Sequence, residues 1–216
     1  GCDGMISMLS DQISKAFLEK LPALKIISNY AAGYNNIDLS YCAKQKIKIT
    51  NTPEVLTEAT TELTLALLLS VSRKIIPAYL NVQTNEWKSW NPTGFIGIGL
   101  QGKTLGIIGP GRIAFEFSKK CRLAFDMNIN YYGRTEKENF NKKLSAKKLP
   151  LVELLKTSDV ISIHCPLTED TKYLISKKEI EQMKSQCILL NTARGEVINQ
   201  QDLEQAIVND VDKSKF

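Results

Sequence analysis

The stretch LGIIGPGRIA, residues 105–114, decides how the second half of this 216-residue chain folds. An apolar run ends at two glycines, Gly109 and Gly111, and a helical pattern follows them directly. In a dinucleotide fingerprint the first glycine permits a tight turn, and the second lets the backbone approach the pyrophosphate. The N–H groups at the start of the helix then bind the pyrophosphate. Ala114 stands where a third glycine is usual. The stretch predicts a strand, a phosphate-binding turn and a helix; the alternative is an α/β turn with incidental glycines.

Apolar runs of strand length alternate with helical patterns on both sides of this stretch. Upstream, the pattern predicts strands over residues 4–9, 24–28 and 47–50, the first of them buried, and helices over 11–20 and 38–45. Downstream, it predicts strands over 103–109, 128–132, 159–164 and 187–191, and helices over 112–125, 151–156 and 200–208. Ser176 and Glu179 form a capping box that predicts the start of another helix. This alternation is typical of parallel sheets covered by helices.

A long helix and a loop separate the two alternating halves. Thr52, Pro53 and Glu54 favour a helix start, and the pattern extends to about residue 79. Its middle, ELTLALLLSV, is apolar nearly all round, which predicts burial between domains or against a partner chain. Residues 81–102 hold both tryptophans and several glycines and prolines, so we expect a loop and a domain boundary there. The chain is therefore expected to be an α/β protein with two domains, residues 1–93 and 94–216.

Composition excludes several classes of protein. The five cysteines are odd in number, are widely spaced and contain no C-x-x-C pair, which argues against a disulfide framework or a zinc site and favours the reducing cytoplasm. The short lysine clusters have no interleaved aromatic residues, so they are interpreted as a solvated face and not as a nucleic-acid site. The longest apolar run, residues 63–71, is too short to span a bilayer.

The residues after the second strand of the downstream half select the dinucleotide. An NAD(H) site usually has a carboxylate there, for the ribose 2′-hydroxyl. The sequence INYYGRTEK instead places Arg134 and Thr135 at this point. A planar guanidinium donates two hydrogen bonds to a phosphate, so the sequence predicts NADP(H). Glu136 and Glu138 follow closely and keep NAD(H) as the alternative, and the other interpretation of Arg134 is an exposed loop arginine.

Further motifs carry a family resemblance. They are HCPLTEDTKYLI (164–175), ILLNTARGEVINQQDL (188–203), LKIISNYAAGYNNIDL (24–39) and NTPEVLTEATTELTLALLL (51–69). With residues 105–114 they resemble the D-isomer-specific 2-hydroxyacid dehydrogenases, most of all the glyoxylate/hydroxypyruvate reductase branch, over essentially the whole chain. The resemblance implies a flavodoxin-like substrate domain and a Rossmann domain, both incomplete here. It also implies NADPH-dependent reduction of a small 2-oxo acid to the D-2-hydroxy acid, and a homodimer.

The resemblance also implies roles for single residues. Arg194, in the N-x-x-R-G motif, matches the catalytic arginine, which would pair with the substrate carboxylate and polarise the ketone. Ala32 and Gly33 match the loop whose amides hold that carboxylate. The implied cofactor contacts are Gly109, Pro110, Gly111, Arg112 and Ile113 for the pyrophosphate; Gly133, Arg134 and Thr135 for the 2′-phosphate; and Cys165, Pro166, Thr171, Thr192 and Ala193 for the adenosine and nicotinamide ends. No metal is implied.

His164 is the only histidine of the chain. The family's catalytic histidine and its glutamate lie downstream of the arginine motif, and neither is found before residue 216. His164 instead matches a strand end beside the cofactor, so we assign it a structural or cofactor-side role. We expect the chain to be a fragment of a normal enzyme; the alternative is a degenerate relative. The alternative from another class is a dinucleotide-sensing interaction protein that resembles the co-repressors of the family.

Overall fold

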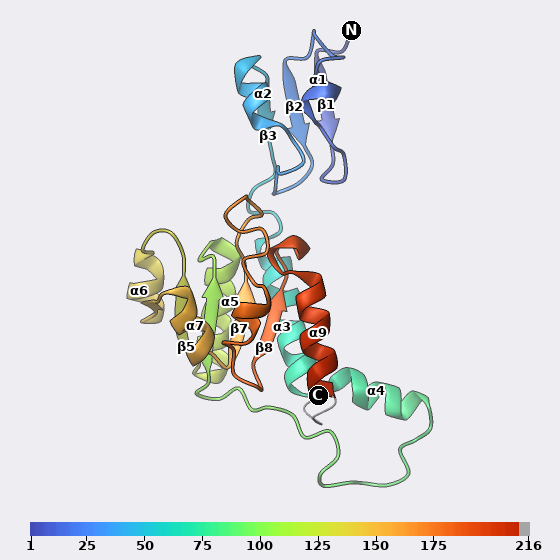
Figure 1. Cartoon of the computed structure of the whole chain (residues 1–216), viewed down its shortest axis with the longest axis vertical. Helices are drawn as coiled ribbons and strands as arrows, with labels where there is room; N and C mark the ends of the chain where they lie inside the picture. The colour runs from blue at the N-terminus through green and yellow to red at the C-terminus, as the bar shows by residue number, and fades with distance from the viewer. Residues whose placement is uncertain (212–216) are drawn as a thin grey trace. The chain divides into compact units, whose positions relative to one another are not determined.

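The computed structural model describes residues 1–211, which form two compact units that divide between Thr57 and Glu58 (Figure 1). The last part of the predicted second domain, residues 212–216, lies outside the described residues. The predicted boundary at residue 93 differs from this division, because leucines of the helix that begins at Thr57 contribute to the core of the second unit. As a division between substrate-binding and cofactor-binding domains, the boundary at residue 93 stays a prediction.

The first unit is a three-stranded parallel sheet with two short helices. The order of its strands is β1 (Gly4–Ser7), β2 (Ile26–Asn29) and β3 (Lys48–Thr50), and the helices are α1 (Lys15–Leu18) and α2 (Leu39–Lys44). One face of the sheet packs on a core that includes Leu18, Ile27 and Cys42. The other face is open within the unit, and Ile6 is 81% exposed. The prediction of a buried first strand is therefore wrong, because the apolar core lies on one face of this sheet only.

The second unit is built on a five-stranded parallel sheet in the order β6-β5-β4-β7-β8. The strands are β4 (Thr104–Ile108), β5 (Asn128–Tyr132), β6 (Lys147–Lys148), β7 (Val160–Ile163) and β8 (Ile188–Asn191). The chain runs outward from β4 through β5 to β6, then returns to β7 on the other side of β4. The carboxyl end of β4 is therefore the point where the strand order reverses, and ligands of open α/β sheets bind at such a point.

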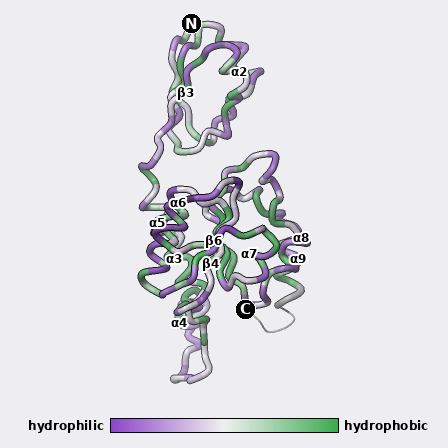
Figure 2. Tube along the Cα trace, turned by 90° about the vertical axis from the view of Figure 1, so that its left-hand side faces the viewer, coloured by the Kyte–Doolittle hydropathy of each residue, from purple (hydrophilic) through white to green (hydrophobic). Residues whose placement is uncertain are grey.

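Helices cover both faces of this sheet, and hydrophobic residues gather in its interior (Figure 2). One core contains residues of α3 (Thr57–Ser72), α5 (Arg112–Phe125) and α6 (Glu138–Leu144). The other contains buried residues of α7 (Leu151–Thr157) and of the 3-10 turn Gly195–Val197. Partly buried residues of α8 (Lys177–Ile180) and α9 (Gln200–Val211) pack against it. Residues of β4 alternate between the two cores, because successive side chains of a strand point to opposite faces.

The single helix predicted to run to about residue 79 is wrong. The structure has two helices, α3 and α4 (Ile75–Gln83), which are bent by 66° at the break. Pro77 explains the break, because it has no N–H to donate to the Arg73 carbonyl and its ring would clash with it. Lys74 takes a left-handed conformation there, with φ 51°. Among the described residues no single helix is long and apolar enough to cross a membrane; α3 and α4 meet that criterion only as a bent pair.

Burial of the α3 and α4 segment is also only partial. Thr61, Thr64, Leu68 and Ser72 of α3 are buried. The opposite side of α3 and most of α4 carry large apolar side chains that the described chain leaves exposed: Leu63, Leu67, Val71, Ile75, Ile76, Tyr79, Leu80 and Val82. We call these residues the apolar face of α3 and α4.

Candidate functional site

The glycine turn lies between the end of β4 and the start of α5, as predicted. Gly109 has φ +89°, and a Cβ atom there would lie 2.6 Å from the backbone nitrogen of Cys165, so only glycine fits. The Gly109 N–H donates to the Tyr132 carbonyl at 3.0 Å, which ties the turn to the end of β5. A Cβ at Gly111 would meet nothing within 4 Å. The turn is therefore packed on its protein side at Gly109 and open at Gly111.

Helix α5 begins directly after this open side. Gly111 is its N-cap residue, with an extended backbone, and Arg112 and Ile113 form its first turn. The N–H groups of a first turn have no partner within their own helix and carry the positive end of the helix dipole. A group with two phosphates fits this arrangement, because the backbone at Gly111 leaves room for it and the N–H groups are aimed at it.

The loop after β5 packs against the glycine turn. A Cβ at Gly133 would lie 2.7 Å from Cδ of Pro110, so the structure brings the two predicted phosphate-binding segments together. Arg134 and Thr135 follow and are exposed. Lys148, the last residue of β6, donates from Nζ to the Arg134 carbonyl at 3.3 Å. The sequence analysis did not find Lys148, since a two-residue edge strand has no apolar pattern.

The end of β7 lies against the same turn. The His164 N–H donates to the Ile108 carbonyl at 2.8 Å, and Nε2 of His164 is 2.9 Å from Oγ of Ser162. The imidazole ring also contacts the ring of Phe117, with centroids 5.9 Å apart. Burial lowers the pKa of His164 to about 4, so the ring is neutral at pH 7. These contacts agree with the structural or cofactor-side role.

Cys165 and the residues after it begin the loop that follows β7. Cys165 is buried against Gly109, and burial raises the pKa of its thiol. Pro166 is exposed. Oγ1 of Thr171 donates to the Pro166 carbonyl at 2.6 Å and accepts from the Thr168 N–H at 2.8 Å, so this hydroxyl holds the loop in shape. Direct contact of Pro166 or Thr171 with a cofactor stays a prediction.

The loop after β8 holds Arg194 through two sets of contacts that the sequence analysis missed. Asn191 donates from Nδ2 to the Arg194 carbonyl at 2.9 Å and accepts from the Ala193 N–H at 3.0 Å. The hydroxyl of Thr192 is 3.0 Å from the hydroxyl of Thr64, a buried residue of α3. Asn191 had a signal, because asparagine at the end of a strand is typical of a side-chain-bonded turn. Thr64 had none, since it lies 128 residues away.

The predicted substrate residues Ala32 and Gly33 lie in the first unit, after β2, and Arg194 lies in the second. The Ala32 carbonyl accepts from Asn51 and the Gly33 carbonyl accepts from Asn29, each at 2.8 Å. Within residues 1–211, the N–H groups of Ala32 and Gly33 donate to no other residue. The loop is therefore held through its carbonyl oxygens, and its N–H groups remain free to donate.

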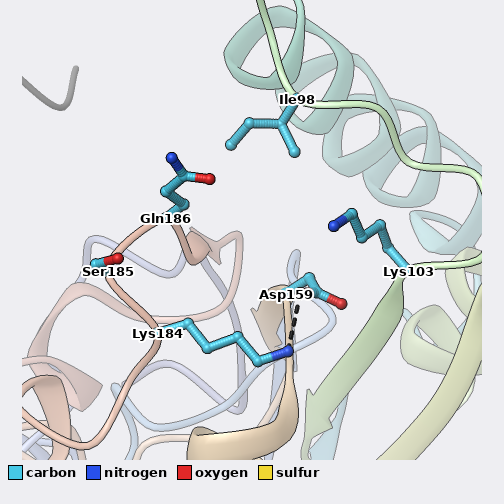
Figure 3. Close-up of a pocket in the computed structure, with 6 residues that line it drawn as sticks. All are labelled: Ile98, Lys103, Asp159, Lys184, Ser185 and Gln186. Atoms are coloured by element: carbon cyan, nitrogen blue, oxygen red, sulfur yellow. Dashed lines mark hydrogen bonds and ion pairs between the residues drawn. The ribbon is translucent and has the colours of Figure 1, made fainter.

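A small pocket lies at the opposite edge of the five-stranded sheet (Figure 3). It is about 210 Å³ in volume and includes Lys103, Asp159 and Lys184, and the first two of these precede the amino ends of β4 and β7. Partial burial of Asp159 raises the pKa of its carboxyl group. Hydrogen bonds from the Thr104 N–H and Lys184, together with the positive charges of Lys184 and Lys103, outweigh this effect and hold the pKa below its usual value. The Asp159 carboxylate thus joins two elements of the fold at the edge away from the glycine turn.

Acid should destabilise the protein through His164. Its pKa is 6.5 when unfolded and about 4 when folded, so between these pH values only the unfolded chain binds the proton. We expect the free energy of unfolding to fall by at most about 3 kcal/mol from pH 7 to pH 4 on this account. Urea unfolding across this range, compared with His164→Gln, isolates the effect, because carboxylates titrate equally in both proteins. Parallel curves for the two proteins would contradict a buried, neutral His164.

Comparisons with known proteins agree with this geometry. The model of the "D-isomer specific 2-hydroxyacid dehydrogenase, NAD binding domain" matches residues 65–213. The chain is 44% identical over 209 residues to the glyoxylate reductase of Thermococcus litoralis. The matched region covers 95% of this chain and 63% of that protein. The chain thus spans less than two thirds of the length of this relative.

Two solved structures are similar over nearly the whole chain. One is a D-lactate dehydrogenase of Aquifex aeolicus complexed with NAD and lactic acid, with TM-score 0.88 and 31% identity, covering 100% of this chain and 62% of that one. The other is a glyoxylate reductase from Paecilomyes thermophila, with TM-score 0.86 and 29% identity, covering 96% and 63%. The chain belongs to the D-isomer specific 2-hydroxyacid dehydrogenase family, with glyoxylate reductases among its relatives.

Proposed function

We propose that this chain contains the NADPH-binding site and part of the substrate site of an enzyme that reduces a small 2-oxo acid, such as glyoxylate or hydroxypyruvate, to the D-2-hydroxy acid. The observation that carries the proposal is the meeting of the Gly109–Gly111 turn with the Gly133–Thr135 loop at the switch point of the sheet. The relatives named glyoxylate reductase support the substrate class.

The residues at this edge fit a phosphorylated dinucleotide, which would supply the hydride when bound. The open side of Gly111 and the first turn of α5 would hold the pyrophosphate. Arg134 would donate to the 2′-phosphate, and Thr135 would add a hydroxyl donor. A relative of known structure was complexed with NAD, so the preference for NADPH rests on Arg134 standing where a carboxylate is usual.

Arg194 would act on the substrate itself. A guanidinium pairs with a carboxylate through two parallel hydrogen bonds, and it stabilises negative charge as it develops on the ketone oxygen. In the first unit, the N–H groups of Ala32 and Gly33 would donate to a substrate carboxylate. Asn191 and Thr64 would position Arg194 by fixing the loop that carries it. His164 is neutral at pH 7 and its Nε2 is paired with Ser162, so we do not assign it the proton transfer.

We infer a homodimer and a cytoplasmic location for the protein. Monomeric proteins rarely expose large contiguous apolar surfaces, and the apolar face of α3 and α4 would be covered by a second copy. All five cysteines are free thiols, and Cys42, Cys121 and Cys165 are buried, which is typical of proteins of a reducing compartment.

Titration of the chain with NADPH and with NADH tests the cofactor preference. Charge-assisted hydrogen bonds from Arg134 are worth roughly 1.5–3 kcal/mol, so the Kd for NADPH should be at least about 10-fold lower. Arg134→Ala should remove most of this difference. Arg122→Ala is the matched control, because it removes the same charge from the last turn of α5. Equal affinities for the two dinucleotides, or tighter binding of NADH, would contradict the proposal.

A further inference from the structure

We propose that Lys148 is a second cation for the 2′-phosphate of NADPH and helps to select NADPH over NADH. The inference rests on the proposed function and deepens it. Its basis is the place of Lys148 in the sheet, its contact with the Arg134 loop, and the absence of a carboxylate partner for either residue among the described residues.

The sheet brings Lys148 to the cofactor edge. It is the last residue of β6, and it lies opposite Tyr131 in the parallel pairing with β5. The Leu149 N–H then donates to the Tyr131 carbonyl at 2.9 Å, which continues the pairing to the end of the strand. Because parallel strands end at the same edge, the end of β6 lies beside the Gly133–Thr135 loop.

The side chain of Lys148 reaches this loop. Its Nζ donates to the Arg134 carbonyl at 3.3 Å, so the ammonium lies against the backbone of the residue assigned to the 2′-phosphate. The same loop packs on Pro110 through Gly133. Lys148, the Arg134 loop and the glycine turn are thus joined by direct contacts. The Lys148 ammonium group has three N–H donors, and the bond to the Arg134 carbonyl uses only one of them.

The charges of this region favour an anion. Acidic residues are nearby in sequence, but Glu138 pairs with Lys142. Across the described side chains of residues 1–208, no ion pair joins Arg134, Lys148 or Glu136 to another residue. Lys148 thus lies against the backbone of Arg134, and neither cation has a carboxylate partner among the described residues. A phosphate monoester carries a charge of about −1.5 to −2 at neutral pH and would balance both of them.

The 2′-phosphate is the only group that distinguishes NADPH from NADH, so the contribution of Lys148 should appear with NADPH alone. We expect Lys148→Ala to raise the Kd for NADPH about 5- to 10-fold, the effect of about one exposed charge-assisted contact. The Kd for NADH should change less than about two-fold. Lys148→Arg should keep most of the affinity. The dependence of NADPH affinity on salt should also be weaker in Lys148→Ala.

Lys147 is the matched control. It is the other residue of β6, is also exposed and carries the same charge, but neighbouring residues of a strand point to opposite faces. Lys147→Ala should leave both affinities unchanged. The inference is overturned if Lys148→Ala weakens NADPH and NADH equally, since Lys148 would then only support the loop, or if it weakens neither. A wild-type chain without NADPH preference would overturn the proposed cofactor as well, whereas a preference that is undiminished in Lys148→Ala would overturn this inference alone.

Discussion

Replacing Arg194 by alanine should lower the turnover of a 2-oxo acid by at least about 10²-fold, the typical effect of removing a group that stabilises a developing oxyanion. Binding of NADPH should change less than about two-fold. The expected separation follows from the structure, in which the backbone of the loop is held by Asn191 and by the contact between Thr64 and Thr192, and not only by the guanidinium. The loop should therefore keep its shape when the Arg194 side chain is removed.

The measurement for Arg194 uses the full product of the gene that encodes this chain, with steady-state oxidation of NADPH and a separate NADPH titration. Arg194→Lys is the informative companion, because it keeps the charge but cannot form two parallel hydrogen bonds with a carboxylate. We expect it to raise KM for the 2-oxo acid and to recover only part of the turnover. Near-normal turnover of Arg194→Ala in a folded protein would refute the catalytic role.

The second large effect is expected at Gly109. Gly109→Ala should lower the free energy of unfolding by about 2–4 kcal/mol and abolish NADPH binding. A left-handed backbone costs a residue with a Cβ roughly 1–2 kcal/mol, and the new Cβ would lie within 2.7 Å of the backbone nitrogen and Cα of Cys165. Relief of this contact must separate β4 from β7, at the point where the phosphate-binding turn begins.

Gly111→Ala is the matched control for Gly109→Ala. Its backbone is extended, with φ −91°, and its Cβ would meet no protein atom within 4 Å, so the expected loss of stability is only the roughly 0.5–1 kcal/mol by which alanine is a poorer N-cap residue than glycine. Affinity for NADPH should still fall, because the Cβ would occupy the space that the pyrophosphate needs. Urea unfolding and NADPH titration of both variants test this. Wild-type stability of Gly109→Ala would contradict the description of the turn.

Most strands and helices of the second unit were predictable from local sequence. The residues of β4 and β7 are buried in nearly continuous runs, and those of β5 and β8 alternate between buried and partly exposed positions. The glycines after β4 mark the turn. The break between α3 and α4 also had a signal, Pro77, which an apolar pattern outweighed in the sequence analysis. By contrast, α6 is a short polar helix that buries only Phe140 and Leu144, and this spacing is too brief to distinguish a helix from a loop.

The candidate site was predictable only in part. Gly109, Arg134 and Arg194 follow strand ends, which parallel topology brings to one edge. The residues that support them come from distant places: Thr64 from α3, and Lys148 from a strand of two lysines that exists only through its pairing with β5. Such contacts depend on the packing of elements and not on local pattern. In the first unit, the carbonyl oxygens of Ala32 and Gly33 accept from Asn51 and Asn29, and no sequence pattern indicated these contacts.

The most direct test of the proposed reaction is the oxidation of NADPH by the full gene product, followed by absorbance, with glyoxylate, hydroxypyruvate and pyruvate supplied separately. We predict oxidation that requires both NADPH and a 2-oxo acid and that yields the D-2-hydroxy acid. A folded protein that binds NADPH tightly, yet oxidises it with none of the three acids, would contradict the enzymatic account and favour a dinucleotide-sensing role.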